Sequence, residues 1–228
     1  MKTYGQFCPV AKASEIFAER WTPLIIRDLL MGSRKFSDLE IGMAHIPRSL
    51  LSQRLKSLEA AGGLTRKTIG SSKRFEYQLT EAGADLFEVV RGLGEWGQKW
   101  VNHDIGAGDV YPALLVWDIH RRVNVDLLPP ERVVVRLTLH GVAKGDYWLV
   151  FERPEPSVCM SDPGLEVDLF VTADTIAIHK VWMGMASLAD CTNDCLIEFH
   201  CLADHVKAFP GWFKISLFPD VKPVVKTG

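Results

Sequence analysis

The chain of 228 residues contains no run of apolar residues near the roughly 20 that a membrane-spanning helix needs. Its first residues, MKTYGQFCPVAKASEIF, carry Lys12 and Glu15 where a secretory signal peptide needs an uninterrupted apolar stretch. Five cysteines are an odd number in a chain of this length, which argues for reduced thiols rather than a disulfide framework. These absences predict a soluble, cytoplasmic protein that has no membrane partner.

Recognisable catalytic and metal-binding motifs are also missing. The sequence has no phosphate-binding glycine loop, no HExxH and no G-x-S-x-G motif. Cys191, Cys195, Cys201 and His205 have residue types that zinc prefers, but their spacing lacks the close pair of ligands typical of a structural zinc site. We therefore expect no enzyme, no cofactor and no metal.

The net charge of −2 conceals an uneven distribution of charge along the chain. Residues 1–103 hold 15 Lys and Arg against 11 Asp and Glu, a net charge of +4, whereas residues 104–228 have a net charge of −6. Between Arg20 and Arg74 the net charge rises to +7. A basic segment within an otherwise acidic chain indicates a binding surface for a polyanion.

The character of the sequence changes near residue 104. Apolar residues at helical spacing dominate before it, and runs typical of strands follow it, such as RVVVRLTL at 132–139 and YWLVFE at 147–152. The junction, NHDIGAGDVYP at 102–112, has the glycines and proline of a linker. We predict an α+β protein of two domains, residues 1–103 and 104–228.

The first domain is expected to be a winged helix-turn-helix, with helices followed by a hairpin and a long last helix. In the second helix, Thr22 is a suitable N-cap and Pro23 the first helical residue. The buried face of that helix is assigned to Leu24, Ile25, Leu29 and Leu30. The other expected elements are short helices at 11–18 and 37–41, a helix from 47 to about 61, strands at 64–69 and 74–79, and one helix from 80 to about 100.

The helix that begins near Pro47 carries the predicted DNA-reading side chains. Leu51, Leu55 and Leu58 lie at spacings of four and three residues and form a stripe that faces the core. The opposite side presents Ser49, Ser52, Gln53 and Lys56. Short polar and cationic side chains are able to reach base edges and phosphates in the major groove of DNA. A solvated helix surface is the alternative.

Basic residues around this helix are candidates for contacts to the DNA backbone. Arg48 lies near the helix start, and Arg34 and Lys35 precede the third helix. The hairpin tip contains Ser72, Lys73 and Arg74, which suit a wing that lies along a phosphate backbone or in a minor groove. Arg54, on the flank of the helix, is left open as a clamp on the DNA backbone or an intramolecular partner.

Several motifs of the first domain resemble those of the HxlR family of bacterial winged-helix transcriptional regulators. The resemblance covers about residues 7–102 and rests on Cys8-Pro9-Val10, RWTPLIIRDLLMG at 20–32, RKFSDL at 34–39, LSQRLKSLE at 51–59, YQLT at 77–80 and Trp96-Gly97. One departure is Gly62-Gly63, where the family usually has a single glycine before the wing. The resemblance implies a regulator that binds double-stranded DNA as a homodimer, through the first and last helices of this domain.

Two further expectations follow from the resemblance. Trp96 and Trp100, one helical turn apart on the last helix, suit a dimer interface, although packing within one chain is the alternative. Cys8 matches a cysteine that some relatives use to sense oxidants or electrophiles, and a thiolate there would be stabilised by a helix N-terminus. A structural cysteine is the alternative for Cys8.

The second domain is expected to be an antiparallel sheet with helices on one side. The order of its elements resembles the sterol-carrier-protein fold over about residues 112–218, through DLFVTAD at 168–174 and FPGWF at 209–213. That fold implies an apolar tunnel for lipid-like molecules, whereas ordinary core packing is the alternative. The expected ligand-binding residues are Trp117, Trp148, Phe170, Trp182, Met185 and Trp212.

These observations predict a dimeric DNA-binding regulator that binds a pseudo-palindromic operator and responds to a small hydrophobic ligand in its second domain. The alternative is a lipid or sterol carrier that uses its winged helix for protein contacts.

Overall fold

The computed structural model describes residues 3–69, 75–101, 105–200, 203–214, 221 and 224. The chain divides into two compact units, Met1–Gly97 and Gln98–Gly228. The division lies before the glycine-rich segment at 102–112 that the sequence suggested as the junction. Within the described part, no helix is both long and apolar enough to cross a bilayer, and no cluster of three or more His, Cys, Asp or Glu is placed to hold a metal ion.

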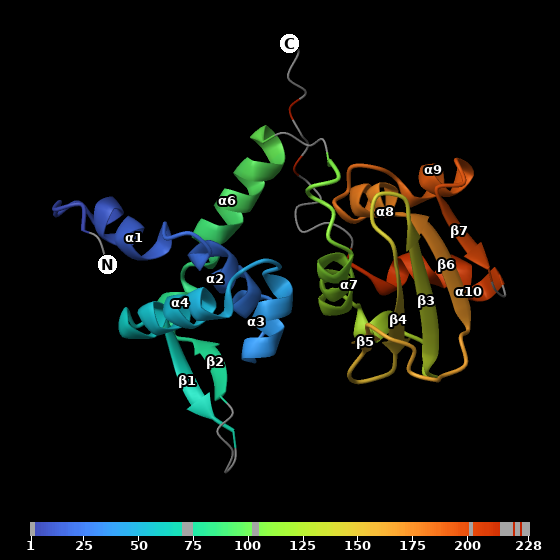
Figure 1. The fold of residues 1–228 in the computed structure, drawn as a ribbon, viewed down its shortest axis with the longest axis horizontal. Helices are drawn as coiled ribbons and strands as arrows, with labels where there is room; N and C mark the ends of the chain where they lie inside the picture. Colours follow the sequence, from blue (N-terminus) through green and yellow to red (C-terminus); the bar gives the residue numbers. More distant parts are fainter. Residues whose placement is uncertain are drawn as a thin grey trace. The chain divides into compact units, whose positions relative to one another are not determined.

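The first unit folds around a small apolar core. Its core side chains come from the second to fourth helices and the first strand, with Ile25, Leu39, Leu51 and Leu64 each at most 1% exposed. The elements, drawn in Figure 1, are α1 (Pro9–Phe17), α2 (Thr22–Leu30), α3 (Phe36–Gly42), α4 (Arg48–Ala60), β1 (Leu64–Thr68), β2 (Phe75–Leu79), α5 (Glu81–Ala84) and α6 (Phe87–Trp100).

Helix α2 differs from its prediction at its start and on its buried face. Thr22 is the first helical residue, and the N-cap is Trp21, whose φ of 79° places a bulky residue in the left-handed region. Leu24 is 38% exposed, so its assignment to the core is corrected, and Ile26, at 0%, is buried instead. The buried side of α2 consists of Thr22, Ile25, Ile26, Asp28 and Leu29, a spacing that leaves Leu24 outside it.

Of the glycines around the wing, Gly62 is required by its backbone conformation and Gly83 by close packing. Gly62 has a φ of +76°, and the side chain of Thr80 donates a 2.6 Å hydrogen bond to its carbonyl oxygen. A Cβ atom on Gly83 would lie 1.9 Å from the carbonyl oxygen of Gly63, so the two backbones pass too closely for a side chain at position 83. The wing strands pair from Leu64 opposite Leu79.

The predicted long helix after the wing is two helices. Thr80 caps α5, because its side chain accepts a 3.1 Å hydrogen bond from the backbone N–H of Gly83. Helix α5 ends at Ala84, and α6 begins three residues later at Phe87. The residues predicted as one helix are therefore helical in two segments, with a break at Asp85 and Leu86.

The second unit is a five-stranded sheet with helices. Strand order is β5-β4-β3-β6-β7, with β3 at the centre (Figure 1). Its elements are α7 (Pro112–Arg121), η1 (Val125–Leu127), β3 (Val133–His140), β4 (Gly145–Phe151), β5 (Ser157–Cys159), β6 (Leu169–Asp174), α8 (Thr175–Trp182), α9 (Leu188–Asn193), β7 (Ile197–His200), α10 (Ala203–Ala208) and η2 (Phe209–Trp212).

The sheet is mixed, which corrects the expectation of a wholly antiparallel one. Strands β3 and β6 pair in parallel from Val135 opposite Leu169 to His140 opposite Asp174, and the other pairs are antiparallel. The residues between β5 and β6 carry the chain past β4 to the far side of β3. Strand order of this kind depends on long-range packing, which alternation within each strand does not encode.

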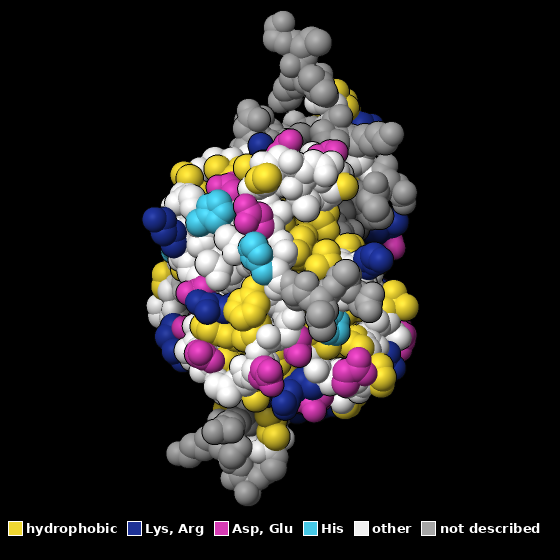
Figure 2. Space-filling model, turned by 90° about the vertical axis from the view of Figure 1, so that its right-hand side faces the viewer, with side chains coloured by type: hydrophobic (Ala, Val, Ile, Leu, Met, Phe, Trp, Pro, Cys, Tyr) yellow, Lys and Arg dark blue, Asp and Glu magenta, His cyan; other side chains and the backbone are white. Residues whose placement is uncertain are grey.

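The two faces of the sheet differ in what covers them. Odd-numbered residues of β3 and β6, such as Val135 and Val171, join side chains of α7, α8 and η2 in the main core. Even-numbered residues face the other way, where Val134, Trp148 and Val150 form a small separate cluster. Figure 2 views the side that carries α9, β7 and α10 and shows acidic, basic and hydrophobic side chains interspersed. No large patch of a single charge is visible on that side.

Candidate nucleic-acid interface and apolar pocket

Helix α4 buries one side and leaves the opposite side open. Leu51, Leu55 and Leu58 are at most 2% exposed. On the other side Ser49, Gln53 and Lys56 are exposed and Ser52 is half-buried. Within the described residues none of these four forms a side-chain hydrogen bond or an ion pair. Three exposed polar groups, with the half-buried Ser52 between them, therefore lie on one helix side at a spacing that a groove of nucleic acid can accept.

The start of α4 carries a cation that is only loosely held. Pro47 is the N-cap, and Arg48 follows as the first helical residue. The Arg48 guanidinium lies 3.3 Å from a carboxylate oxygen of Glu40 and 5.4 Å from the ring centre of Phe36. Its side chain is 74% exposed. An ion pair so exposed adds little stability, and Arg48 is able to leave it for a phosphate.

Arg34 and Lys35 have different surroundings although they are neighbours. Arg34 Nη1 donates hydrogen bonds of 2.7 Å and 2.9 Å to the carbonyl oxygens of Leu29 and Ser33, so this guanidinium satisfies the end of α2. Lys35 is exposed at the N-cap of α3. A β-bridge between Lys35 and Glu76 sets the start of α3 beside the wing strand β2. Lys35 is therefore the better placed of the two for an external contact.

The wing offers two cations that sequence reasoning missed. Lys67 and Arg66 are exposed on β1, and Arg66 lies 4.4 Å over the ring of Phe75 on the paired strand. The basic pair in a strand next to a turn was the available signal. The predicted tip residues Ser72, Lys73 and Arg74 lie outside the described residues.

Arg54 also contacts its own chain, but unlike Arg48 it is largely buried there, with its side chain 16% exposed. Its Nη2 lies 2.6 Å from Oε2 of Glu19, and its Nε donates a 3.0 Å hydrogen bond to the carbonyl oxygen of Arg20. Of the two roles left open for Arg54, the structure shows the intramolecular one.

Cys8 is the N-cap residue of α1 and is partly exposed. The backbone N–H groups of Ala11 and Val10, in the first turn of the helix, hold the pKa of this thiol below its ordinary value. The Cys8 side chain forms no capping hydrogen bond. A lowered pKa at a helix start is the direction of shift that reactive cysteines show.

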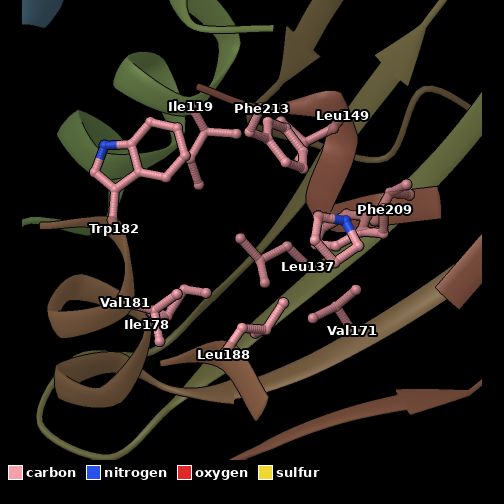
Figure 3. A pocket seen from close by; sticks show the side chains of 12 residues that line it. Ile119, Leu137, Leu149, Val171, Ile178, Val181, Trp182, Leu188, Phe209 and Phe213 are labelled. Carbon is pink, nitrogen blue, oxygen red and sulfur yellow. The ribbon is translucent and has the colours of Figure 1, made fainter. Parts of the chain in front are cut away.

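An apolar pocket lies between the helix-covered face of the sheet and the elements that cover it (Figure 3). Strand residues Leu137 and Val171 face helix residues Ile178, Val181 and Leu188 across it. The free space is about 40 Å³, and the remaining lining residues are Ile119, Val135, Leu149, Trp182, Phe209, Pro210 and Phe213. Space of this size and lining is expected to stay dry and to accept an apolar group.

The structure separates the six predicted ligand-binding residues. Trp182 lines the pocket. Trp212 lies in the same core, 2% exposed, and its ring centre is 5.9 Å from that of the lining residue Phe209. Trp148 and Phe170 lie on the other face of the sheet, because even-numbered strand positions point away from the helices. Trp117 stacks on His120 and, like Met185, does not line the pocket.

A charged cluster holds one wall of the pocket to α7. The indole nitrogen of Trp182 points away from the cavity and donates a 2.7 Å hydrogen bond to Oδ2 of Asp118. Arg122 pairs with the same carboxylate oxygen and lies 4.5 Å over the Trp182 ring. Burial alone would raise the pKa of Asp118, but Arg122, the indole N–H and Arg121 together hold it below its ordinary value.

Comparisons with known proteins concern the first unit. Residues 16–105 match the family described as HxlR-like helix-turn-helix. The chain is 35% identical over 100 residues to YvaP of Bacillus subtilis, an HTH-type transcriptional regulator, covering 43% of this chain and 93% of YvaP. It is 42% identical over 93 residues to the HTH-type transcriptional regulator Mb3122 of Mycobacterium bovis, covering 40% of this chain and 58% of that protein.

A solved structure also resembles part of the chain. The structure of the redox regulator HypR in its reduced form is 26% identical in sequence. The match covers 40% of this chain and 90% of the HypR chain, with a TM-score of 0.38.

Proposed function

The chain belongs to the family of HxlR-like helix-turn-helix transcriptional regulators, and on that premise we propose that it binds double-stranded DNA by placing α4 in the major groove. The observation that carries the proposal is the outward side of α4, where Ser49, Gln53 and Lys56 are exposed and unengaged among the described residues. Gln53 suits a bidentate contact to adenine, and Lys56 suits guanine or phosphate.

Backbone contacts are assigned to the cations that surround α4. Arg48 and Lys35 supply them near the starts of α4 and α3. Ser72, Lys73 and Arg74 supply them from the wing, together with Lys67 on β1. Arg34 contributes less, since its guanidinium already satisfies two carbonyl groups. Contacts of this class fix the position of a protein on DNA and make its affinity depend on salt.

Homodimer formation is supported by the exposed apolar side of α6. Leu93, Trp96 and Trp100 are 51%, 59% and 43% exposed, which is unusual for large apolar side chains on one helix. Val10 on α1 is 72% exposed. A second copy that covers these residues would present two α4 helices to one side of the duplex, about one helical turn of DNA apart, and would account for a pseudo-palindromic operator.

The apolar pocket is the proposed site for a regulatory hydrophobic ligand. Its lining supports this role, which is also what the resemblance of the sequence to the sterol-carrier-protein fold implies. The free space of about 40 Å³ holds only a small group, so a larger ligand has to displace lining side chains such as Phe209 or Leu188. A ligand then alters DNA binding only if it prefers one of the two states of the protein.

The pocket also favours a second candidate function, a carrier of hydrophobic molecules whose winged helix contacts protein. The two functions differ in their response to salt. Binding to DNA releases counterions and weakens steeply as salt rises, whereas an apolar ligand is bound with little dependence on salt.

Cys8 is proposed as a redox-sensitive residue of the same regulator. The lowered pKa of its thiol and its position at the start of α1 support this role. A thiol oxidant is expected to change DNA affinity in the unmodified chain and to leave a Cys8→Ser variant unaffected.

Footprinting on the DNA that flanks the protein's own coding region tests the proposal. We expect two protected half-sites and an affinity that falls between 50 and 200 mM salt by roughly 10³-fold for about six phosphate contacts. Absence of any protected region on that DNA and on random genomic fragments would favour the carrier. Mass spectrometry of small molecules that purify with the protein tests the ligand.

A further inference from the structure

Arg54 occupies the flank of α4, between the buried leucines and the exposed polar side. Its side chain is 16% exposed, much less than the 74% of Arg48 on the same helix. Two of its nitrogens contact neighbouring residues of the chain. Nη2 lies 2.6 Å from Oε2 of Glu19, and Nε donates a 3.0 Å hydrogen bond to the carbonyl oxygen of Arg20. An ion pair and a hydrogen bond to two consecutive residues together restrict the direction of a guanidinium as well as its distance.

Glu19 and Arg20 form the turn that joins α1 to α2. The next residue, Trp21, has a φ of 79°, a backbone conformation that costs energy in a bulky residue and persists only where neighbouring groups hold it. Ile16, Glu19, Thr22, Arg54, Ser57 and Leu58 line a small crevice at this point. Arg54 therefore connects α4 to a constrained turn.

We propose that Glu19 and Arg54 position the DNA-reading helix and do not contact DNA themselves. The inference rests on the proposed function and deepens it, because it assigns a role in DNA binding to an acidic residue. Arg54 holds α4 against the α1–α2 turn, and Glu19 holds Arg54. The direction of the outward side of α4 depends on this connection.

A contrast within the same helix makes the proposal specific. Glu40 also pairs with an arginine of α4, but its partner Arg48 is highly exposed and is proposed to contact phosphate. Removing Glu40 frees a cation for DNA. Removing Glu19 frees α4 from the α1–α2 turn. Loss of Glu19 and loss of Glu40 therefore have opposite effects on the affinity for DNA, although each changes the net charge by the same amount.

The first test compares four variants on a labelled duplex that contains the footprinted site. Glu19→Gln is expected to weaken binding about tenfold, equal to ~1.4 kcal/mol, and Glu40→Gln to strengthen it about twofold. Arg54→Gln is expected to weaken binding and keep the wild-type slope of log affinity against log salt. Lys56→Gln weakens binding and lowers that slope by about 0.9, as loss of one phosphate contact requires.

Two outcomes would overturn the proposal: tighter binding by Glu19→Gln, as simple charge removal dictates, or a slope for Arg54→Gln that falls as far as that for Lys56→Gln. Arg54→Lys separates a positioning role from a direct phosphate contact. It keeps the positive charge, so a phosphate contact would survive, but it cannot reach Glu19 and the carbonyl group of Arg20 together, so a positioning role would be lost.

Hydrogen exchange without DNA tests the same connection independently of the proposed function. Faster exchange in α4 and at residues 19–22 is expected in Glu19→Gln and Arg54→Gln, and unchanged exchange there in Glu40→Gln. Equal exchange in all variants would refute the connection even if DNA binding is confirmed. If the wild-type protein binds no DNA, the proposed function fails, and faster exchange would still establish the connection.

Discussion

The indole nitrogen of Trp182 and Oδ2 of Asp118 are 2.7 Å apart, so a residue that lines the apolar pocket is held to the first helix of the second unit. Helix α7 follows the segment that leads from the DNA-binding unit in the chain. Movement of Trp182 on ligand binding would reach Asp118 directly. The two residues join the proposed ligand site to the element nearest the linker in sequence.

Replacing Asp118 with Asn is expected to destabilise the protein by about 3 kcal/mol at pH 7, because the negative charge that faces Arg122, a residue 7% exposed, is removed. The pKa of Asp118 is lowered in the folded protein, so its stabilising contribution is complete above the unfolded value of about 3.9. The contribution is lost as the pH falls through the lower, folded pKa.

Urea unfolding followed by tryptophan fluorescence from pH 3 to 7 measures this difference. The gap between wild type and Asp118→Asn should be constant above about pH 5 and shrink below about pH 4. A gap that widens towards acid would contradict the assigned charge state. Asp162→Asn, at an exposed loop residue, is the control and should change little.

A charged substitution on the exposed apolar side of α6 is expected to prevent dimer formation. Trp96→Glu places a charge where a second copy is proposed to pack, and the loss of a large aromatic contact should weaken association by at least about 2 kcal/mol. Sedimentation velocity should show a monomer at concentrations where the wild type is a dimer. Glu88→Ala, on the same helix and 66% exposed, should remain a dimer. A monomeric wild-type protein would remove this part of the proposal.

Cys8 is expected to be the more reactive of two cysteines with opposite pKa shifts. Backbone N–H groups lower the pKa of Cys8, whereas burial raises that of Cys191. Since the thiolate is the reacting species, iodoacetamide at pH 7 should alkylate Cys8 at least about tenfold faster. Peptide mass spectrometry measures both rates in one sample. Equal rates would show that the thiol at the helix start is not activated.

The sequence predicts the helices of the first unit well because local patterns determine them. The spacing of Leu51, Leu55 and Leu58 identifies the buried side of α4, and the same periodicity places Gln53 and Lys56 outside. Leu24 is apolar but lies off the stripe that Ile25, Ile26 and Leu29 form, so apolar character alone assigns it wrongly. Whether a basic side chain pairs with a carboxylate of its own chain or stays available for a phosphate likewise depends on the folded structure.

The second unit was harder to predict from its sequence. Its strands are evident from composition, but the parallel pairing of β3 with β6 depends on how the chain crosses the sheet. Large aromatic residues drew attention to Trp148 and Phe170, and their even-numbered positions place them on the face away from the pocket. The pocket is lined instead by ordinary aliphatic residues such as Leu137 and Val171, which composition does not distinguish from core.

Photo-crosslinking from position 53 tests the central claim most directly. With p-benzoylphenylalanine in place of Gln53, irradiation of the complex with the footprinted duplex should link the protein to bases inside each half-site. The same group at Glu81, an exposed residue of α5, should give no crosslink to a base. Crosslinks to a second protein chain from position 53, or none at all while DNA is bound, would show that α4 does not read the groove.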